Sequence, residues 1–215
     1  MDSLKETNAK TRRAYNLVAR KYHELFHDEL KEKAYDRELL DGFAGRLPKG
    51  AFVCDAGCGP SGHIGRYLTD KGVRVVGVDV SDRCVELARK HNPGMRFERQ
   101  DIGAMTFASG SFDGVVAYYS IIDTPKRHME RIFREFQRVL KPAGALLVVV
   151  KAGTEEGYIY DLLGLKTEIY FTLFSEKEIG DYFTKCGFRL DFLDRRDPYG
   201  FEIQSERIFA IGIKV

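Results

Sequence analysis

The feature that most restricts the fold of this chain is a glycine-rich turn directly after an apolar run. The run AFVCD at residues 51–55 leads into AGCGPSG, which places Gly57, Gly59 and Gly62 in the turn, and helical apolar spacing resumes beyond Gly62. Glycine lacks a Cβ atom, so it adopts positive φ and lets other atoms approach the backbone. The N–H groups of such a turn and of the following helix suit an anionic or polar ligand group. The segment predicts a strand, turn and helix, either as a ligand site or as a tight connection alone.

Short apolar runs alternate with amphipathic helical segments along the rest of the chain. Two helices are expected in the first fifty residues, and later ones after Gly62, around Val85, over 125–140 and after the capping box at Ser175. Strands are expected at 51–54, 73–78, 95–98, 112–118, 145–150, 188–193 and 207–213. This alternation predicts a doubly wound α/β fold with a mainly parallel sheet and helices on both faces. Residues 154–174 are aromatic and fit no clear pattern, so we interpret them as an insertion over the carboxyl edge of the sheet.

The composition fits one globular domain. The chain has 215 residues, of which 44% are apolar and 31% charged, with a formal net charge of +2. We divide it into a helical cap (1–49), a cofactor-binding core (50–150), an acceptor-side insertion (151–174) and a C-terminal helix with strands (175–215). The near-neutral charge argues against nucleic acid as the main partner, and no apolar run approaches the roughly 20 residues of a membrane span. No secretory signal is visible, so we expect a cytoplasmic protein, as monomer or homodimer, with free cysteines and no metal site.

Two acidic residues follow the glycine turn in register with the expected strands. Asp79 ends the second strand, and Asp101 follows the third. A carboxylate at the first position can take both hydroxyls of a ribose, and one at the second can accept a hydrogen bond from an adenine amino group. A lone Asp after a strand is commonly a turn residue, but two in register favour a nucleoside ligand. A nicotinamide dinucleotide is the alternative, and it fits less well because Asp55 would face the pyrophosphate.

Five segments in order resemble the class I S-adenosylmethionine-dependent methyltransferases, closest to the small-molecule branch called type 11 or ubiquinone/menaquinone biosynthesis methyltransferase-like. They are DAGCGPSG, GVDVS, RQDI, SFDGVVAYYSIID and RVLKPAGALLVVV, spanning about residues 50–150. The resemblance implies a seven-stranded sheet that is parallel except for an antiparallel last strand, with an N-terminal helical lid. It also implies S-adenosylmethionine as cofactor and the following site: Asp55, Gly57, Gly59 and Gly62 at the methionine part, Asp79 and Val80 at the ribose, Asp101 and Ile102 at the adenine, Tyr118 beside the sulfonium, and Tyr15 and Tyr22 in the covering helix.

Methyl transfer needs alignment of acceptor, methyl group and sulfur more than it needs a strong catalytic group. A general base is required only where the acceptor must lose a proton. Asp123 is the best-placed candidate, because SIID follows the fourth strand, and Tyr118 is the second candidate catalytic residue. Many relatives carry histidine near this position, and Asp123 is equally well interpreted as an N-cap for the next helix. His23, His27 and His128 are the other candidate bases.

The acceptor is expected to be a small molecule. After the fourth strand the chain reads AYYSIID, which lacks the Asn/Asp-Pro-Pro-Tyr pattern of amino-group methylation and the proline–cysteine pair of cytosine C5 methylation. We expect three segments to wall the acceptor chamber: the helix with Tyr15 and Tyr22, the turn at 118–120, and residues 158–174. Two other functions stay open: a catalytically silent S-adenosylmethionine-binding protein and a nicotinamide-dependent oxidoreductase.

Overall fold

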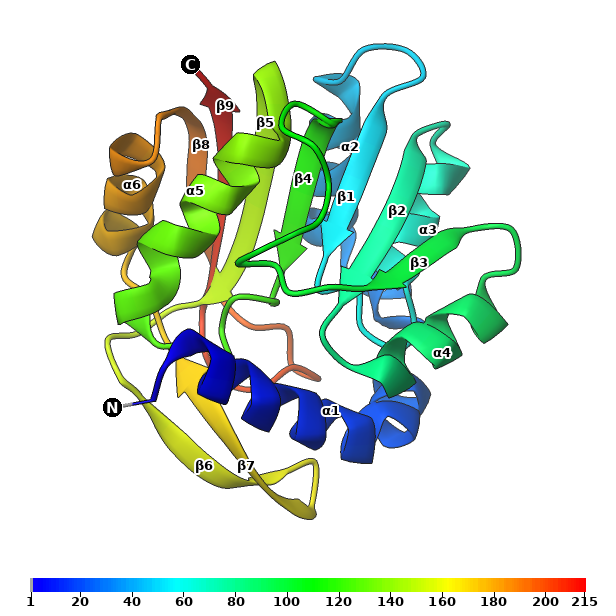
Figure 1. Ribbon diagram of the computed structural model, residues 1–215, viewed down its shortest axis with the longest axis vertical. Coiled ribbons are helices and arrows are strands. Elements are labelled where there is room, and N and C mark those ends of the chain that lie inside the picture. Colours follow the sequence, from blue (N-terminus) through cyan, green and yellow to red (C-terminus); the bar gives the residue numbers. More distant parts are fainter. Residues whose placement is uncertain (1) are drawn as a thin grey trace.

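The computed structural model describes residues 2–215 and is organised around one seven-stranded sheet (Figure 1). The strands run in the order β3-β2-β1-β4-β5-β9-β8. Strands β1 to β5 are parallel, and β9 is antiparallel to both of its neighbours. The predicted doubly wound sheet with an antiparallel last strand is therefore confirmed. The strands are β1 (Phe52–Ala56), β2 (Arg74–Asp79), β3 (Arg96–Arg99), β4 (Phe112–Tyr118), β5 (Leu140–Lys151), β8 (Phe188–Arg196) and β9 (Arg207–Lys214).

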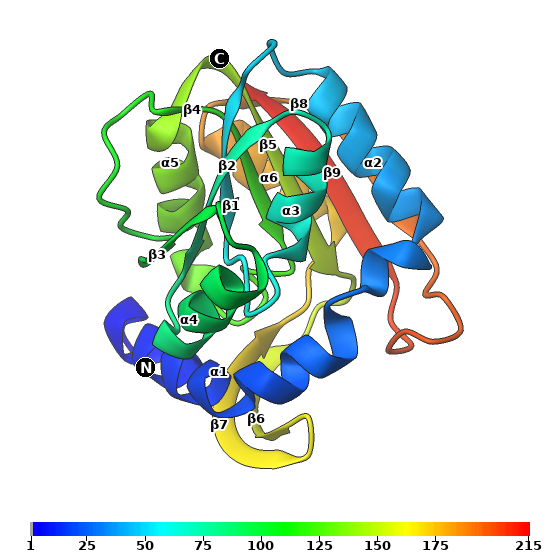
Figure 2. The same cartoon turned by 90° about the vertical axis from the view of Figure 1, so that its right-hand side faces the viewer.

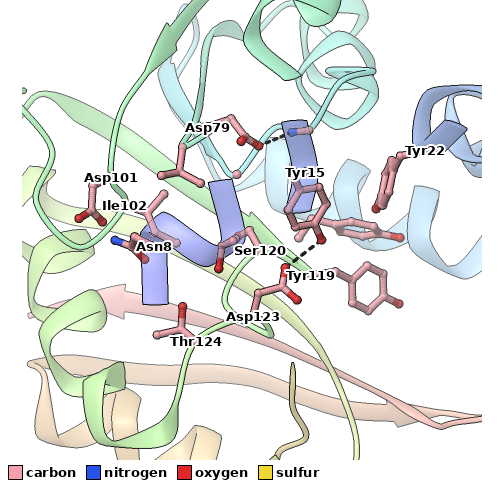
Figure 3. Close-up of a pocket in the computed structure, with 15 residues that line it drawn as sticks. Asn8, Tyr15, Tyr22, Asp79, Asp101, Ile102, Tyr119, Ser120, Asp123 and Thr124 are labelled. Atoms are coloured by element: carbon pink, nitrogen blue, oxygen red, sulfur yellow. Dashed lines mark hydrogen bonds between the residues drawn. The ribbon is translucent and has the colours of Figure 1, made fainter. Parts of the chain in front are cut away.

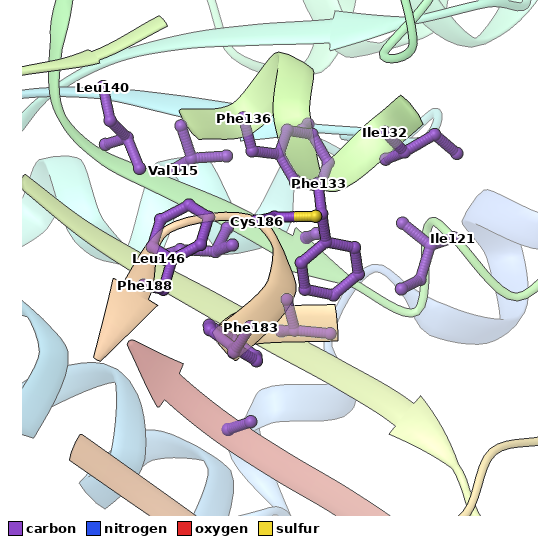
Figure 4. Close-up of a cluster of buried hydrophobic side chains, with 14 of the residues drawn as sticks. Val115, Ile121, Ile132, Phe133, Phe136, Leu140, Leu146, Phe183, Cys186 and Phe188 are labelled. Atoms are coloured by element: carbon purple, nitrogen blue, oxygen red, sulfur yellow. The ribbon is translucent and has the colours of Figure 1, made fainter. Parts of the chain in front are cut away.

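Helices cover both faces of the sheet, as predicted. Alternate residues of β5 point to opposite sides, because side chains along a strand have a period of two. Leu147 packs with α2 (Ala34–Gly45) and α3 (His63–Asp70), which Figure 2 shows together on one side. Leu146 packs with α5 (Met129–Val139) and α6 (Glu176–Lys185), where Phe133 and Phe183 fill the core (Figure 4). Helix α4 (Asp82–His91) packs Val85 against Phe97 of β3.

The predicted elements lie within a few residues of the observed ones, with one difference around residue 140. We expected Lys141-Pro142-Ala143-Gly144 to separate helix from strand, but β5 begins at Leu140, directly after α5. Its pairing with β4 is irregular here, and Ala143 has a φ of 59°. The predicted capping box is present at the start of α6, where Ser175 accepts from the Glu178 backbone N–H. All four cysteines are buried free thiols.

A helix and a hairpin lie outside the sheet, at the end where β1 and β4 finish (Figure 1). Helix α1 (Leu4–Phe26) crosses this end, and a short 3-10 helix, η1 (Glu29–Lys31), leads from it to α2. Residues 154–174, which the sequence left unassigned, form the hairpin of β6 (Glu156–Leu162) and β7 (Leu165–Thr172). The hairpin packs against α1, with Lys10 Nζ 2.8 Å from Glu168 Oε1. No helix within residues 2–215 combines the length and the apolar character needed to cross a bilayer.

Candidate functional site

A cavity lies between α1 and the carboxyl ends of the central strands (Figure 3). Five separate segments form the wall: α1, the glycine turn after β1, the end of β2, the end of β3, and the loop after β4. The lining residues are Asn8, Thr11, Tyr15, Tyr22, Gly57, Gly59, Asp79, Val80, Asp101, Ile102, Tyr118, Tyr119, Ser120, Asp123 and Thr124.

The three glycines of the turn have different structural roles. Gly57 has a φ of 83° and packs so closely on the loop after β4 that a Cβ atom there would lie 2.2 Å from Ser120 Cβ. Gly62 has a φ of 55° at the start of α3, and its Cβ would lie 2.8 Å from the Phe97 ring. Gly59 has a φ of 61°, and a Cβ there would have no neighbour within 4 Å among the described residues. Gly57 and Gly62 thus shape the turn, whereas Gly59 leaves open space beside the cavity.

Asp79 links the end of β2 to the glycine turn. One carboxylate oxygen accepts the Gly59 N–H at 3.0 Å, and the other accepts the Ser81 N–H at 2.8 Å. Burial raises the pKa of Asp79 to about 6, while these backbone hydrogen bonds act in the opposite direction. A carboxylate has about four lone-pair sites, so both oxygens can accept further donors from the cavity.

Asp101 and Ile102 continue this side of the cavity beyond β3. Figure 3 shows both side chains on the same side as Asp79. Asp101 Oδ1 accepts the Gly103 N–H at 2.8 Å, which sets the side chain in a tight local turn. Val80 completes the lining between the two acids. The acids predicted from their positions after β2 and β3 are therefore neighbours along one wall.

Tyrosines and a half-buried acid form the opposite side of the cavity. Tyr15 of α1 donates its hydroxyl to Asp123 Oδ2 at 2.8 Å, and burial raises the pKa of Asp123 to about 7. Tyr22 packs edge-on against Tyr15, with ring centroids 5.9 Å apart. Tyr118 donates its hydroxyl to the buried Asp36 of α2. Tyr119 has a φ of 52°, a conformation that bulky residues seldom adopt outside functional sites.

The comparisons with known proteins agree with this geometry. The sequence profile of the family described as "Methyltransferase domain" matches residues 53–144, which include the turn and both acids. The malonyl-acyl-carrier protein O-methyltransferase of Enterobacter lignolyticus is 34% identical over 122 residues, or 56% of this chain and 45% of that protein. The 2-methyl-6-phytyl-1,4-hydroquinone methyltransferase of a Synechocystis species is 35% identical over 106 residues, or 47% of this chain and 32% of that protein.

Solved structures share the fold over a larger part of the chain. A Burkholderia thailandensis 1,6-didemethyltoxoflavin-N1-methyltransferase, with its acceptor and S-adenosylhomocysteine bound, superposes with a TM-score of 0.77 at 18% identity, covering 100% of this chain and 92% of that one. A Methanosarcina mazei S-adenosylmethionine-dependent methyltransferase gives a TM-score of 0.71 at 22% identity, covering 80% and 95%.

Residues 53–144 of this chain are thus similar to a methyltransferase domain, and its fold is that of solved S-adenosylmethionine-dependent methyltransferases. The chain spans about half the length, or less, of the curated relatives described above. The acceptors of those relatives therefore say nothing direct about the acceptor of this chain.

Asp55 is one position where the structure differs from our expectation. The resemblance implied that Asp55 holds the methionine part of the cofactor, but its side chain is not among those lining the cavity. Its Oδ2 instead accepts the Gly65 N–H of α3 at 3.1 Å. Burial raises the pKa of Asp55 to about 7, and the nearby His63 partly offsets this. The carboxylate is turned under the first turn of α3, so the structure gives it a role in holding strand to helix. Gly62 likewise lies outside the cavity wall.

The alternative candidate bases also lie elsewhere. His23 Nδ1 is 3.1 Å from Ser61 Oγ, and its ring stacks on His91. None of His23, His27 and His128 lines the cavity. The N-cap interpretation of Asp123 is wrong, because Pro125 holds the cap position of the 3-10 helix η2 (Lys126–His128), where no side-chain cap bond forms within the described chain.

Two further differences between prediction and structure concern the residues that line the cavity. Asn8, Thr11 and Thr124 line the cavity but were not predicted. Positions 8, 11, 15 and 22 recur at helical spacing, so this stripe of α1 was a usable signal. No residue of the segment 158–174 belongs to the wall, contrary to our expectation. The hairpin instead supports the loop after β4, where the Thr172 N–H donates to the Ile122 carbonyl at 2.7 Å.

Proposed function

We propose that this chain transfers a methyl group from S-adenosylmethionine to a small-molecule acceptor. The observation that carries the proposal is the single cavity that brings together the open Gly59 and the two acids Asp79 and Asp101, beneath α1. These residues lie 20 and 42 positions after Gly59 in the chain, yet they meet along one wall. A tight strand–helix connection alone would need neither acid there.

The residues at this wall suit the parts of S-adenosylmethionine. The backbone at Gly57 and Gly59 offers close approach for the methionine part, since no Cβ stands at Gly59. Asp79 accepts the ribose hydroxyls in addition to its two backbone donors. Asp101 and Ile102 hold the adenine edge and face. The buried, unpartnered Ser120 Oγ, which finds no hydrogen bond within residues 2–215, adds a polar group next to Gly57.

The remaining residues enclose and orient the acceptor. When bound, S-adenosylmethionine would supply a methyl group on positively charged sulfur, and the acceptor's lone pair would displace that sulfur. Tyr15, Tyr22 and Tyr118 provide aromatic walls that exclude water and suit a nearby positive charge. Asp123, with a pKa of about 7, is poised to accept a proton from an acceptor that must lose one.

Ligand binding tests this proposal against the two alternatives. Titration calorimetry should show that S-adenosylhomocysteine binds and that NAD and NADP do not, and the melting temperature should rise with S-adenosylhomocysteine by mass action. Tight dinucleotide binding without adenosyl-sulfur binding would reject the proposal in favour of an oxidoreductase. A methyl-transfer screen on metabolite extracts, read by mass spectrometry, then separates an enzyme from a silent binding protein. The proposal includes a cytoplasmic setting and a monomeric or homodimeric enzyme.

A further inference from the structure

Asn8, in the second turn of α1, is a half-buried side chain that lines the cavity. Its amide forms no hydrogen bond with any of residues 2–215. Asparagine is a poorer helix former than alanine, because its side chain competes for backbone hydrogen bonds. Here it forms no such bond, so it neither caps the helix nor stabilises it. The presence of an asparagine at this position therefore points to the cavity.

The first turn of α1 is packed against the loop after β3. Leu4 is buried there, and a Cβ atom built on Gly103 would lie 3.0 Å from Leu4 Cδ2 and 3.3 Å from Asp101 Oδ1. The Arg131 guanidinium of α5 holds the same loop, because its Nε donates to the Gly103 carbonyl at 3.1 Å. The start of α1 and the carboxylate of Asp101 therefore meet around one glycine.

Asn8 follows Leu4 by one helical turn and shares its face of α1, because residues four apart in a helix are neighbours. Figure 3 shows the Asn8 side chain beside Asp101 and Ile102, and all three residues line the cavity. Tyr15, further along the same helix, lies on the opposite side with the other tyrosines (Figure 3). Asn8 is therefore the part of α1 that borders the adenine side of the site.

The groups around Asn8 match the hydrogen-bonding edges of adenine. Asp101 Oδ2 accepts no hydrogen bond from residues 2–215, and the Ile102 backbone N–H donates none to them. This acceptor and donor suit the amino group and the ring nitrogen N1. An asparagine amide also presents one acceptor and one donor, and it pairs with the amino group and N7 of adenine in nucleic-acid recognition. The amino group has two hydrogens, so it can serve both partners.

We propose that Asn8 recognises the adenine of the cofactor, its amide oxygen accepting from the amino group and its amide nitrogen donating to N7. This inference rests on the proposed function. A contact between Asn8 and the methyl acceptor fits less well, because Asn8 lies with Asp101 and not with the tyrosines (Figure 3). The same contact fastens α1 to the bound cofactor. Since α1 also carries Tyr15 and Tyr22, recognition of adenine positions the helix that covers the acceptor.

An analogue that differs in one ring atom tests the inference. In 7-deaza-S-adenosylhomocysteine a C–H group replaces N7. Titration calorimetry on the wild type should show that this analogue binds about five- to tenfold more weakly than S-adenosylhomocysteine, as expected for one lost hydrogen bond. Asn8→Ala should bind S-adenosylhomocysteine more weakly than the wild type does and should not distinguish the two ligands. Asn8→Asp has no N–H to donate and should also lose the preference. Lys5→Ala, at an exposed position of the same helix, is the control and should keep it.

The ratio of the two affinities separates recognition from a structural role. Alanine is the better helix former, so Asn8→Ala should melt no lower than the wild type without ligand. If the wild type binds both ligands equally well, this inference alone is overturned. A preference for S-adenosylhomocysteine that survives in Asn8→Ala overturns it as well, even where the variant binds both ligands more weakly. Failure of the wild type to bind S-adenosylhomocysteine rejects the proposed function, and this inference with it.

Discussion

The hydroxyl of Tyr15 donates a 2.8 Å hydrogen bond to the carboxylate of Asp123, 108 residues further along the chain. The bond joins the N-terminal helix α1 to the loop after β4, and both residues line the cavity. It also stabilises the ionised form of Asp123 against the larger effect of burial, which raises the pKa to about 7. The covering helix and the candidate proton acceptor are therefore physically coupled.

Asp123→Asn should reduce the pH dependence of folding stability. The pKa of Asp123 is 3.8 unfolded and about 7 folded, so the folded state binds more protons between those values. Its contribution is fully present below pH 4 and is lost as the pH rises through 7, by no more than about 4 kcal/mol for that difference. Asparagine keeps an oxygen for Tyr15 but does not titrate. Urea unfolding at pH 4.5 and 7.5 should show a smaller decrease in the variant; an identical decrease would contradict the raised pKa.

Asp79→Ala should weaken S-adenosylhomocysteine binding by about 1.5–3 kcal/mol, as expected for hydrogen bonds to a charged group. The backbone N–H groups of Gly59 and Ser81 would lose their acceptors in this variant. The variant should therefore also lose stability, by about 1–3 kcal/mol. Calorimetry and urea unfolding measure the two effects. Asp70→Ala, at the exposed end of α3, is the control. Unchanged affinity in folded Asp79→Ala would remove Asp79 from the site.

Alanine at two glycines of the turn should have contrasting effects. Gly57→Ala places a Cβ 2.2 Å from Ser120 Cβ, so the loop after β4 must shift and the unliganded protein should lose several kcal/mol of stability. Gly59→Ala adds only the cost of positive φ, about 1–2 kcal/mol, yet should lose cofactor affinity because its Cβ enters the cavity. Gly110→Ala, with a φ of 68° and equally open surroundings, matches that strain away from the cavity. If Gly59→Ala and Gly110→Ala bind S-adenosylhomocysteine equally well, Gly59 does not contact the ligand.

Tyr22→Ala and Tyr170→Ala should show the difference between a residue of the cavity wall and a residue that only supports the fold. Tyr22 lines the cavity, so its loss should reduce acceptor turnover more than it lowers the melting temperature. Tyr170 lies on β7 against Tyr158, with ring centroids 4.9 Å apart, and does not line the cavity. Its loss should cost about 1–3 kcal/mol of stability and leave turnover per folded molecule nearly unchanged. If Tyr170→Ala is as stable as the wild type but has low turnover, the hairpin does contribute to the wall of the acceptor chamber.

Local sequence signals were sufficient to predict the helices and strands of the sheet and the residues on one side of the site. Apolar periodicity and the turn residues predicted the strands and helices of the sheet to within a few residues. Asp79 and Asp101 were identified because the ends of parallel strands share one edge, so position in the chain translates directly into position in space. Thr124 had no such signal, because nothing local indicates that its loop folds back toward α1.

The sequence by itself determined the fold class, the glycine turn and the nucleoside-side acids, because these depend on spacing within single strand–turn–helix units. Only the tertiary structure decided which side chains meet across units. It turned Asp55 toward α3 rather than the cavity, paired Tyr15 with Asp123, and kept the aromatic hairpin out of the cavity wall. Such pairings depend on distances between segments far apart in sequence, which packing of the whole chain sets.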